Sequence, residues 1–325
     1  MGLCMYRNSI TWFSLVIGCI LFLPFAPPVR SSLLTSAPEI DAYFSPLLAK
    51  GKSKRGSSSL KITRYTYANS VLVVTPGRRG IGKELSMRLN QGVRGIYTQY
   101  GKPRLKKRPE FWLVSDSTEM RLVLTHRNFR LSEARLKTAL QRGAYRDAGR
   151  VVLRIQKGVP RDWILRVFFT EYARGLQDAL VGSRRLSPIG WLNAGMSAYF
   201  SWRAQGELEG WKRERYEKLF FQYYAGHFDP RKPVPLELLE RPEDWRKALE
   251  ERPAAVYAQA ALVYLYLART RGARIGAVIL RNYSRERSFS SAFERAVSLN
   301  LKDFERELNM KFYPGIKVSR GEKSN

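Results

Sequence analysis

One stretch of the chain, residues 163–202, limits the fold more than any other. From Trp163 to Leu180, apolar residues recur at steps of three and four, which is the spacing of a helix with a wide buried face. Residues 182–190 are rich in glycine, serine and proline, and a second apolar helical pattern then contains Trp191–Ser201. We therefore predict two long, largely buried helices joined by a loop.

The first of these helices carries a zinc-peptidase motif from which the metal ligands are missing. In H-E-x-x-H, two histidines at i and i+4 bind one zinc ion, and the intervening glutamate activates the bound water. Here the five positions read Thr170, Glu171, Tyr172, Ala173 and Arg174. Because only the glutamate is retained, this pattern alone also fits an ordinary amphipathic helix.

The second helix carries a matching motif, again without its ligand. Residues 191–201 read WLNAGMSAYFS, and Trp191, Gly195 and Tyr199 fit the pattern W-L-x-E-G-x-A-x-Y. Together the two motifs resemble those of the peptidase-MA-like gluzincins, a family of zinc metallopeptidases. In that family the glutamate of W-L-x-E-G is the third zinc ligand, and Ala194 stands in its place here.

The resemblance runs from about residue 62 to residue 311 and implies an α+β fold, in which a small N-terminal sheet precedes a mostly helical gluzincin-like (zincin) domain. It places Glu171 at the family's general-base position, as a vestige, and makes Thr170, Arg174 and Ala194 the degenerate ligand positions. It also implies a cleft scaffold, which consists of Tyr172, Trp191, Asn193, Gly195 and Tyr199. The family's cofactor is zinc, but one carboxylate without an imidazole cannot supply three protein ligands. We therefore expect no bound metal and no other cofactor.

The net charge and the rarity of cysteine and histidine exclude several kinds of site. The chain has 57 Lys and Arg against 28 Asp and Glu, a net charge of +29 that attracts polyanions. Its cysteines are Cys4 and Cys19, so the folded part has no disulfide, cysteine nucleophile or cysteine metal site. Its histidines, His126 and His227, are far apart in the sequence, so a histidine-based site would have to be built around one of them.

The first 59 residues have the pattern of an export signal followed by a linker. Residues 10–25 are mostly apolar, follow Arg7 and lead into prolines, which is typical of a signal peptide or signal anchor within residues 1–30. Cleavage, retention as an anchor and lipidation at Cys19 are all open. Residues 31–59 form a basic linker with serine and proline. We expect an exported protein that is membrane-anchored, periplasmic or extracellular.

Residues 60–313 form the expected peptidase-MA-like domain. Its sheet-containing part, 60–160, has three apolar runs with strand character, at residues 71–74, 111–114 and 151–155. Its helical part, 161–313, includes residues 253–268, which we interpret as a buried helix because they are too few for a membrane span and include three tyrosines. Residues 314–325 are expected to form a loose basic tail.

Two basic segments raise the question of anion binding. Residues 77–83 match the phosphate-binding pattern G-x-x-x-x-G-K, but Glu84 stands where a P-loop needs Ser or Thr for magnesium. We therefore interpret this segment as a basic turn. Residues 102–109 form a basic loop without interleaved aromatic residues, which disfavours nucleic acid as a partner. Together with the linker, this loop favours an anionic membrane surface.

Two functions of different class fit these features. The first is a non-catalytic pseudopeptidase of the cell envelope, which binds an envelope protein or peptide or supports an assembly. In this hypothesis Arg174, three residues after Glu171 on the same helix, replaces the positive charge that zinc provides in the family. The alternative is an active peptidase or other hydrolase that uses Glu171 in a metal-free site or with help from His126, His227 or Tyr257. Such a site would lack zinc, the Lewis acid of the family's chemistry.

Overall fold

The computed structural model describes most of the chain after residue 60. The described residues are 61–103, 108–126, 129, 131–147, 149–155, 159–181, 189–286 and 288–319. The expected export signal, the basic linker, the centre of the basic loop and most of the loop between the two motif helices lie outside the described residues. The same holds for residues 320–325 of the expected tail.

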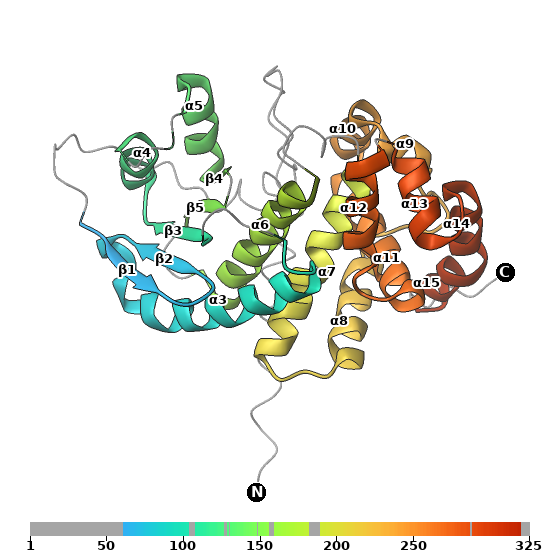
Figure 1. The fold of residues 1–325 in the computed structure, drawn as a ribbon, viewed down its shortest axis with the longest axis horizontal. Coiled ribbons are helices and arrows are strands. Elements are labelled where there is room, and N and C mark those ends of the chain that lie inside the picture. Colours follow the sequence, from blue (N-terminus) through green and yellow to red (C-terminus); the bar gives the residue numbers. More distant parts are fainter. Residues whose placement is uncertain are drawn as a thin grey trace, which may run out of the picture.

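A mixed sheet of five strands forms the first part of the described chain (Figure 1). Its strands are β1 (Thr63–Thr66), β2 (Val71–Val74), β3 (Glu110–Val114), β4 (Ala144–Asp147) and β5 (Arg150–Arg154). The order across the sheet is β1-β2-β3-β5-β4, with β2, β3 and β5 parallel and each edge strand antiparallel to its neighbour. The three apolar runs predicted as strands therefore form the centre of the sheet.

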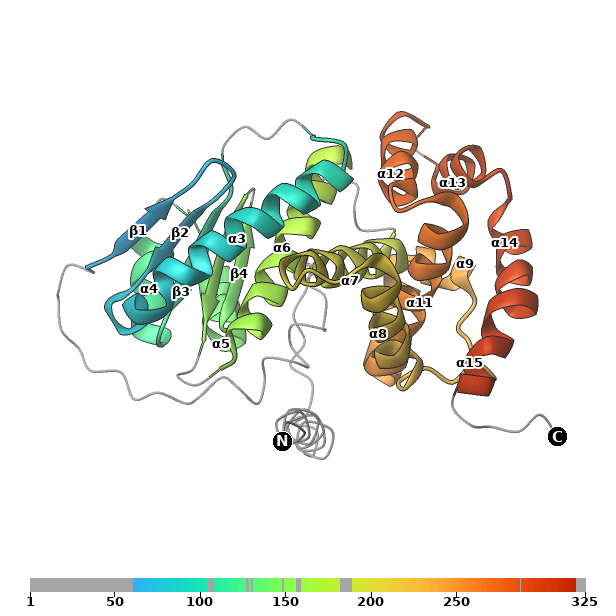
Figure 2. The same ribbon diagram turned by 90° about the horizontal axis from the view of Figure 1, so that it is seen from below.

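Helices cover both faces of this sheet. Helices α3 (Arg79–Gln99) and α6 (Arg161–Val181) lie on one face of the sheet (Figure 2). Helices α4 (Ser117–His126) and α5 (Glu133–Arg142) lie on the other face. Phe111 of β3 enters the core with α3 and α6, whereas its neighbour Trp112 enters the core with α4 and α5. Successive residues of a strand point to opposite faces, so a strand covered on both faces is apolar without interruption.

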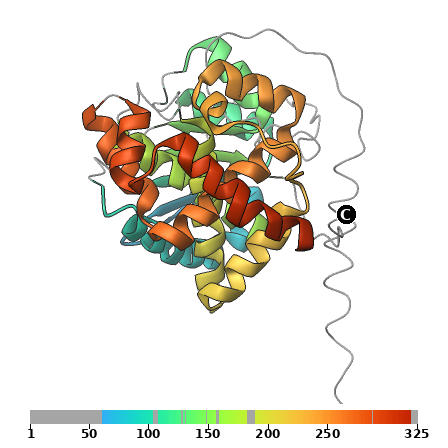
Figure 3. The same cartoon turned by 90° about the vertical axis from the view of Figure 1, so that its right-hand side faces the viewer.

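The rest of the chain is a bundle of helices that begins with the two motif helices α6 and α7. The helices after α6 are α7 (Gly190–Leu208), α8 (Arg213–Ala225), α9 (Leu236–Glu240), α10 (Pro242–Glu251), α11 (Pro253–Arg271), α12 (Ile275–Glu286), α13 (Phe289–Val297), α14 (Leu301–Glu307) and α15 (Tyr313–Ser319). A π-helical stretch, Leu308–Phe312, joins α14 to α15, and this last segment, dark red in Figure 3, lies across the outer end of the bundle. The expected α+β order, a small sheet before a mostly helical part, is confirmed.

Helix α7 is buried on nearly all sides, because it packs between α6 and α11 and also contacts α3 and α8. Trp191 is fully buried and packs edge-on against Phe289 and Phe293 of α13, with ring centroids 6.0 and 6.3 Å away. Gly195 lies so close to α11 that a Cβ atom would overlap the carbonyl oxygen of Ala260. The glycine of the second motif therefore permits close packing of two helices.

Substitution of Gly195 by alanine tests this packing. We expect Gly195→Ala to lower the free energy of unfolding by about 1–3 kcal/mol, because the added methyl group meets backbone of α11 rather than a flexible side chain. Gly175→Ala in α6 is the control, since a Cβ there has no neighbour within 4 Å. That change should stabilise the protein by about 0.5–1 kcal/mol. Urea denaturation gives both values, and effects of the same sign would contradict the packing described.

The carboxy-terminal segment differs from its sequence-based interpretation. A loose tail was expected from residue 314, but α15 extends to Ser319, and the side chains of Tyr313 and Ile316 are buried. The tail prediction is therefore wrong for residues 314–319, because these apolar side chains extend the preceding helical segment. The interpretation of residues 253–268 as a buried helix agrees with α11, and no helix among the described residues has both the length and the apolar character needed to cross a membrane.

The segment that matches the P-loop pattern also has a defined structure. Pro76–Arg78 form a single 3-10 turn after β2, and residues 79–83 already belong to α3. Gly82 packs against the ring of Tyr65, where a side chain would not fit. Since its second half is helical, the segment does not form the extended phosphate-binding loop of P-loop proteins.

Candidate functional site

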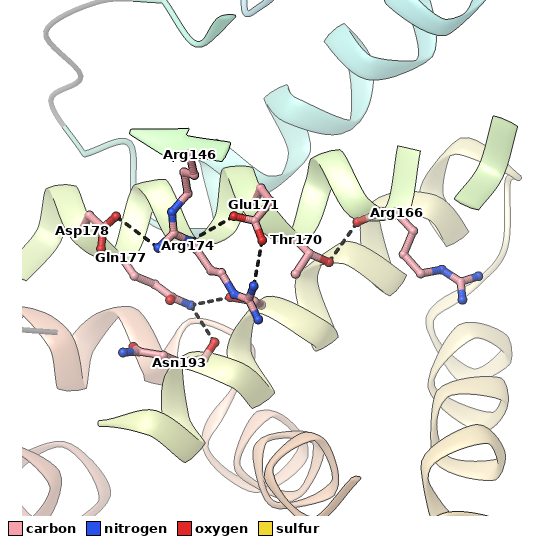
Figure 4. Close-up of polar contacts among 9 residues, drawn as sticks. Arg146, Arg166, Thr170, Glu171, Arg174, Gln177, Asp178 and Asn193 are labelled. Carbon is pink, nitrogen blue, oxygen red and sulfur yellow. Dashed lines mark hydrogen bonds and ion pairs between the residues drawn. The ribbon is translucent and has the colours of Figure 1, made fainter. Parts of the chain in front are cut away.

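The carboxylate of Glu171 is the centre of the candidate site. It lies in the middle of α6 and is 3% exposed. The Nη1 atom of Arg174 donates to its Oε1 at 2.7 Å, and the Nη1 atom of Arg146 donates to its Oε2 at 3.2 Å (Figure 4). Arg174 is itself buried, with 8% of its side chain exposed. The predicted contact between Arg174 and Glu171 is thus present inside the protein.

Arg146 reaches this carboxylate from the edge strand β4 and also approaches a second acid. Its Nη2 atom lies 3.8 Å from Oδ2 of Asp178, which is one helical turn beyond Arg174 on α6. Burial raises the pKa of Asp178 and the charge of Glu171 adds to this, whereas the guanidinium groups of Arg146 and Arg174 act in the opposite direction. Two carboxylates and two guanidinium groups therefore form one charge-balanced cluster.

The raised pKa of Asp178 has a measurable consequence. A carboxyl whose pKa is higher in the folded than in the unfolded state stabilises the fold below the unfolded pKa, and this contribution is lost as the pH rises through the folded pKa. We therefore expect the change in the free energy of unfolding caused by Asp178→Asn to be more favourable at pH 7 than at pH 4. The difference should be less than about 1 kcal/mol, because the side chain is partly exposed. Chemical denaturation at both pH values measures the difference, and a larger benefit at pH 4 would contradict this sign.

The two other positions that the resemblance equates with zinc ligands, 170 and 194, carry side chains that are not typical zinc ligands. Thr170 is partly buried, and its Oγ1 donates to the carbonyl oxygen of Arg166 at 2.9 Å. Ala194 lies in the buried part of α7 and presents only a methyl group. Hydroxyl and methyl groups therefore stand where the resemblance would place the imidazole and carboxylate ligands of zinc.

A buried glutamine connects the two motif helices next to this cluster. Nε2 of Gln177 in α6 lies 3.1 Å from the carbonyl oxygen of Asn193, 3.0 Å from Oγ of Ser197 and 3.0 Å from the hydroxyl of Tyr100. Gln177 is 1% exposed, so these polar contacts are made without competition from water. They hold α7 and the end of α3 against the helix that carries Glu171.

The proposed scaffold residues support α6 and α7 from several sides, and the described contacts of four of them lead away from Glu171. Tyr172 packs edge-on against Phe111 of the sheet, with ring centroids 6.0 Å apart. The hydroxyl of Tyr199 donates to Glu217 of α8 at 2.8 Å. Trp191 packs against α13 and Gly195 against α11, so these contacts hold α6 and α7 in place between the sheet and the bundle.

The residues that the hydrolase alternative would use to help Glu171 make other contacts. The ring of His227, just after α8, packs against Tyr223 with centroids 5.3 Å apart, and burial lowers its pKa. Tyr257 of α11 packs edge-on against Trp245, with centroids 5.8 Å apart. No contact within the described part of the chain joins either residue to Glu171, and the side chain of His126 lies outside that part.

The residues at this site do not fit a zinc ion. Zinc is held by imidazole, thiolate or carboxylate groups, and Glu171 is the one residue of that kind at the four motif positions. Both of its oxygens already accept hydrogen bonds from arginines, whose positive charges would repel a dication. Among the described residues, no three His, Cys, Asp or Glu side chains are grouped so that they could hold a metal ion.

Sequence reasoning missed three members of the site: Arg146, Gln177 and Asp178. Two of them had a signal, because Gln177 is three residues and Asp178 four residues after Arg174, on the same side of one helix. Arg146 had none, because its contact with Glu171 depends on the hairpin of β4 and β5 beside α6.

Comparison with known proteins gives a distant likeness of fold. No protein-family model matches the sequence, and no curated protein matches it. Among solved structures, the chain is similar to the crystal structure of the aminopeptidase N family protein from Idiomarina loihiensis, with 11% sequence identity and a TM-score of 0.50. The match covers 76% of this chain and 46% of that protein, so the chain spans less than half of its length. This likeness is one of fold alone, and it loosely fits the peptidase-MA-like fold implied by the two motifs.

Proposed function

We propose that the protein is a catalytically inactive, peptidase-like protein that is exported and acts in the cell envelope by binding a partner or supporting an assembly. The observation that carries this proposal is the state of Glu171. A general base must reach a water molecule to take its proton, and Glu171 is 3% exposed, with each of its oxygens held by a hydrogen bond from a guanidinium group. The carboxylate therefore serves as a counter-ion in a buried charge cluster.

Replacement of a zinc ion by arginine side chains would explain both altered positions, 174 and 194, at the same time. A catalytic zinc would have put two positive charges beside Glu171, and Arg174 and Arg146 now provide two guanidinium charges in the same place. A glutamate at position 194 would have added a further buried negative charge, and Ala194 avoids it. Charge balance is thus kept without a metal, which supports a stable, non-catalytic role for the site.

The alternative of an active hydrolase has less support. It requires Glu171 to activate water without a described histidine or metal group beside it, and it requires the carboxylate to be released from two arginines. An envelope protein or peptide is the partner we favour, and the basic linker and basic loop would bring the protein to an anionic membrane surface. Nucleic acid is not expected as a partner.

Metal analysis together with a peptidase assay on the purified full chain tests the proposal. We expect far less than one zinc per chain, no hydrolysis of a mixed peptide library, and a melting temperature that is the same with and without a chelator, because a metal bound only to the folded state would raise it. Glu171→Gln is the control for activity. Stoichiometric zinc, or hydrolysis that is lost in Glu171→Gln, would show that the protein is an enzyme and overturn the proposal.

A further inference from the structure

A second polar cluster lies away from Glu171, where the central strands of the sheet end. Strand β2 ends at Val74, and one 3-10 turn leads directly into α3, whose first turn has neither a capping side chain nor an acidic residue. The first-turn amides of a helix have no intrahelical acceptor and carry partial positive charge. Here the amide of Arg79 already donates to the carbonyl oxygen of Pro76 in the 3-10 turn, so it is not available to a ligand. A Cβ added at Gly80 would have no neighbour within 4 Å, so the space beside this turn is open.

Arg78 points to a ligand at this place. It is 8% exposed, yet within the described chain its guanidinium makes no hydrogen bond or ion pair, and its Nε atom is buried without a partner. Burial lowers the pKa of Arg78, and the negative charge of Glu119 opposes this effect. A buried guanidinium is normally paired and hydrogen-bonded, so one without a partner calls for an anion or ordered water.

A serine hydroxyl at the end of β3 lies next to the same turn. The Oγ atom of Ser115 is buried and has no hydrogen-bond partner in the described structure. Gly77 lies directly against it, and any side chain at position 77 would overlap this oxygen. Two polar groups from neighbouring strand ends, the Arg78 guanidinium and the Ser115 hydroxyl, are therefore both unsatisfied beside the start of α3.

The acidic residues nearby are already hydrogen-bonded. Oε2 of Glu119 accepts from the hydroxyl of Thr75 at 2.5 Å and from the backbone amide of Ser115 at 2.7 Å. Asp116 accepts from the amide of Glu119 at 2.8 Å, at the start of α4. Arg154, at the end of β5, is also buried, and its guanidinium donates to the hydroxyl of Ser117. Two arginines balance these two acids, and the exposed Arg79 of the first turn of α3 adds a further positive charge.

We propose that the first turn of α3 together with Arg78 and Ser115 binds a phosphate group, either as the free ion or in a small phosphate ester. Ligands of sheets with parallel strands bind outside the carboxyl ends of these strands, and a helix start there supplies amide donors. Arg78 would add charge-assisted hydrogen bonds, and the Ser115 hydroxyl would add one more donor. The site is not that of a nucleotide-binding P-loop, because Glu84 follows Lys83 where a P-loop has the Ser or Thr that holds magnesium.

Titration of the full chain with inorganic phosphate, followed by calorimetry at constant ionic strength, tests this site. We expect saturable binding that chloride does not reproduce. Arg78→Gln should weaken it at least about tenfold, because charge-assisted hydrogen bonds are lost. Arg274→Gln is the matched control, since it removes the same charge from an exposed residue of the helical bundle, away from the start of α3, and should change the affinity less than about threefold.

Two further measurements keep the test independent of folding and of overall charge. Ser115→Ala should weaken phosphate binding without any change in net charge, and thermal melts of each variant establish that it is folded. A parallel titration with glycerol 3-phosphate distinguishes the two sources, since the tighter of the two ligands shows whether the site prefers an ester or the free ion. Absence of saturable phosphate binding, or equal binding by wild type and a folded Arg78→Gln, would overturn the proposal.

Discussion

Replacement of Arg174 by methionine is expected to lower the free energy of unfolding by about 3 kcal/mol. Loss of one partner from a buried ion pair costs about 3–5 kcal/mol, because the other charge is left in a medium that solvates it poorly. The lower end applies here, since Arg146 still contacts the other oxygen of Glu171 at 3.2 Å. Urea denaturation of wild type and Arg174→Met at pH 7 measures the effect.

A double-mutant cycle shows whether this loss belongs to the pair. Glu171→Gln should also destabilise the protein, and the double variant should cost clearly less than the sum, because the second change removes the charge that the first one leaves unpaired. Arg203 and Glu207 are the control, since their Nε to Oε1 distance is also 2.7 Å but the pair is more exposed. Their coupling should be about 0–1 kcal/mol. Additive losses at Arg174 and Glu171 would remove the basis for regarding arginine as the replacement of zinc.

The parts of the fold that the sequence predicts well are those with a strong hydrophobic pattern. The steps of three and four from Trp163 onward correspond to α6, and the continuous apolar runs correspond to β2, β3 and β5. Strand β4, with the sequence AYRD, has no such pattern, because it is a short edge strand and its pairing with β5 supplies what its side chains do not. The tail was missed because Pro314 and Gly315 disfavour a helix in the sequence pattern, whereas the burial of Ile316 depends on its position against the bundle.

For the candidate site too, contacts within one helix could be predicted from the sequence, and contacts between distant segments could not. The pair of Glu171 and Arg174 was accessible because both residues lie on one helix, where the spacing fixes the distance. Arg146 is separated from Glu171 by 25 residues and by a change from strand to helix, so its role depends on the topology of the sheet. The glycine of the second motif was recognised as a pattern, but its physical role at Ala260 required the position of α11.

The resemblance to zinc peptidases makes a stronger claim than fold, namely that three altered positions still converge on one point. We expect the triple variant Thr170→His, Arg174→His and Ala194→Glu to bind zinc, because it would restore two imidazoles and a carboxylate, the ligand set of a three-ligand zinc site. Without metal this variant should be less stable than wild type, since it loses the Arg174 pair and gains a buried carboxylate.

Zinc should then reverse that loss. A ligand at a concentration about a thousand times its Kd stabilises the folded state by about 4 kcal/mol, so the melting temperature of the triple variant should rise on addition of zinc and fall with a chelator. The matched control places the glutamate one helical turn further, with Thr170→His, Arg174→His and Ala198→Glu, and should bind zinc far more weakly because the third ligand is displaced along α7. Equal zinc binding by the two triple variants, or none by either, would mean that positions 170, 174 and 194 do not surround one point, and the two motifs would then be a resemblance of sequence without the geometry of the zinc site.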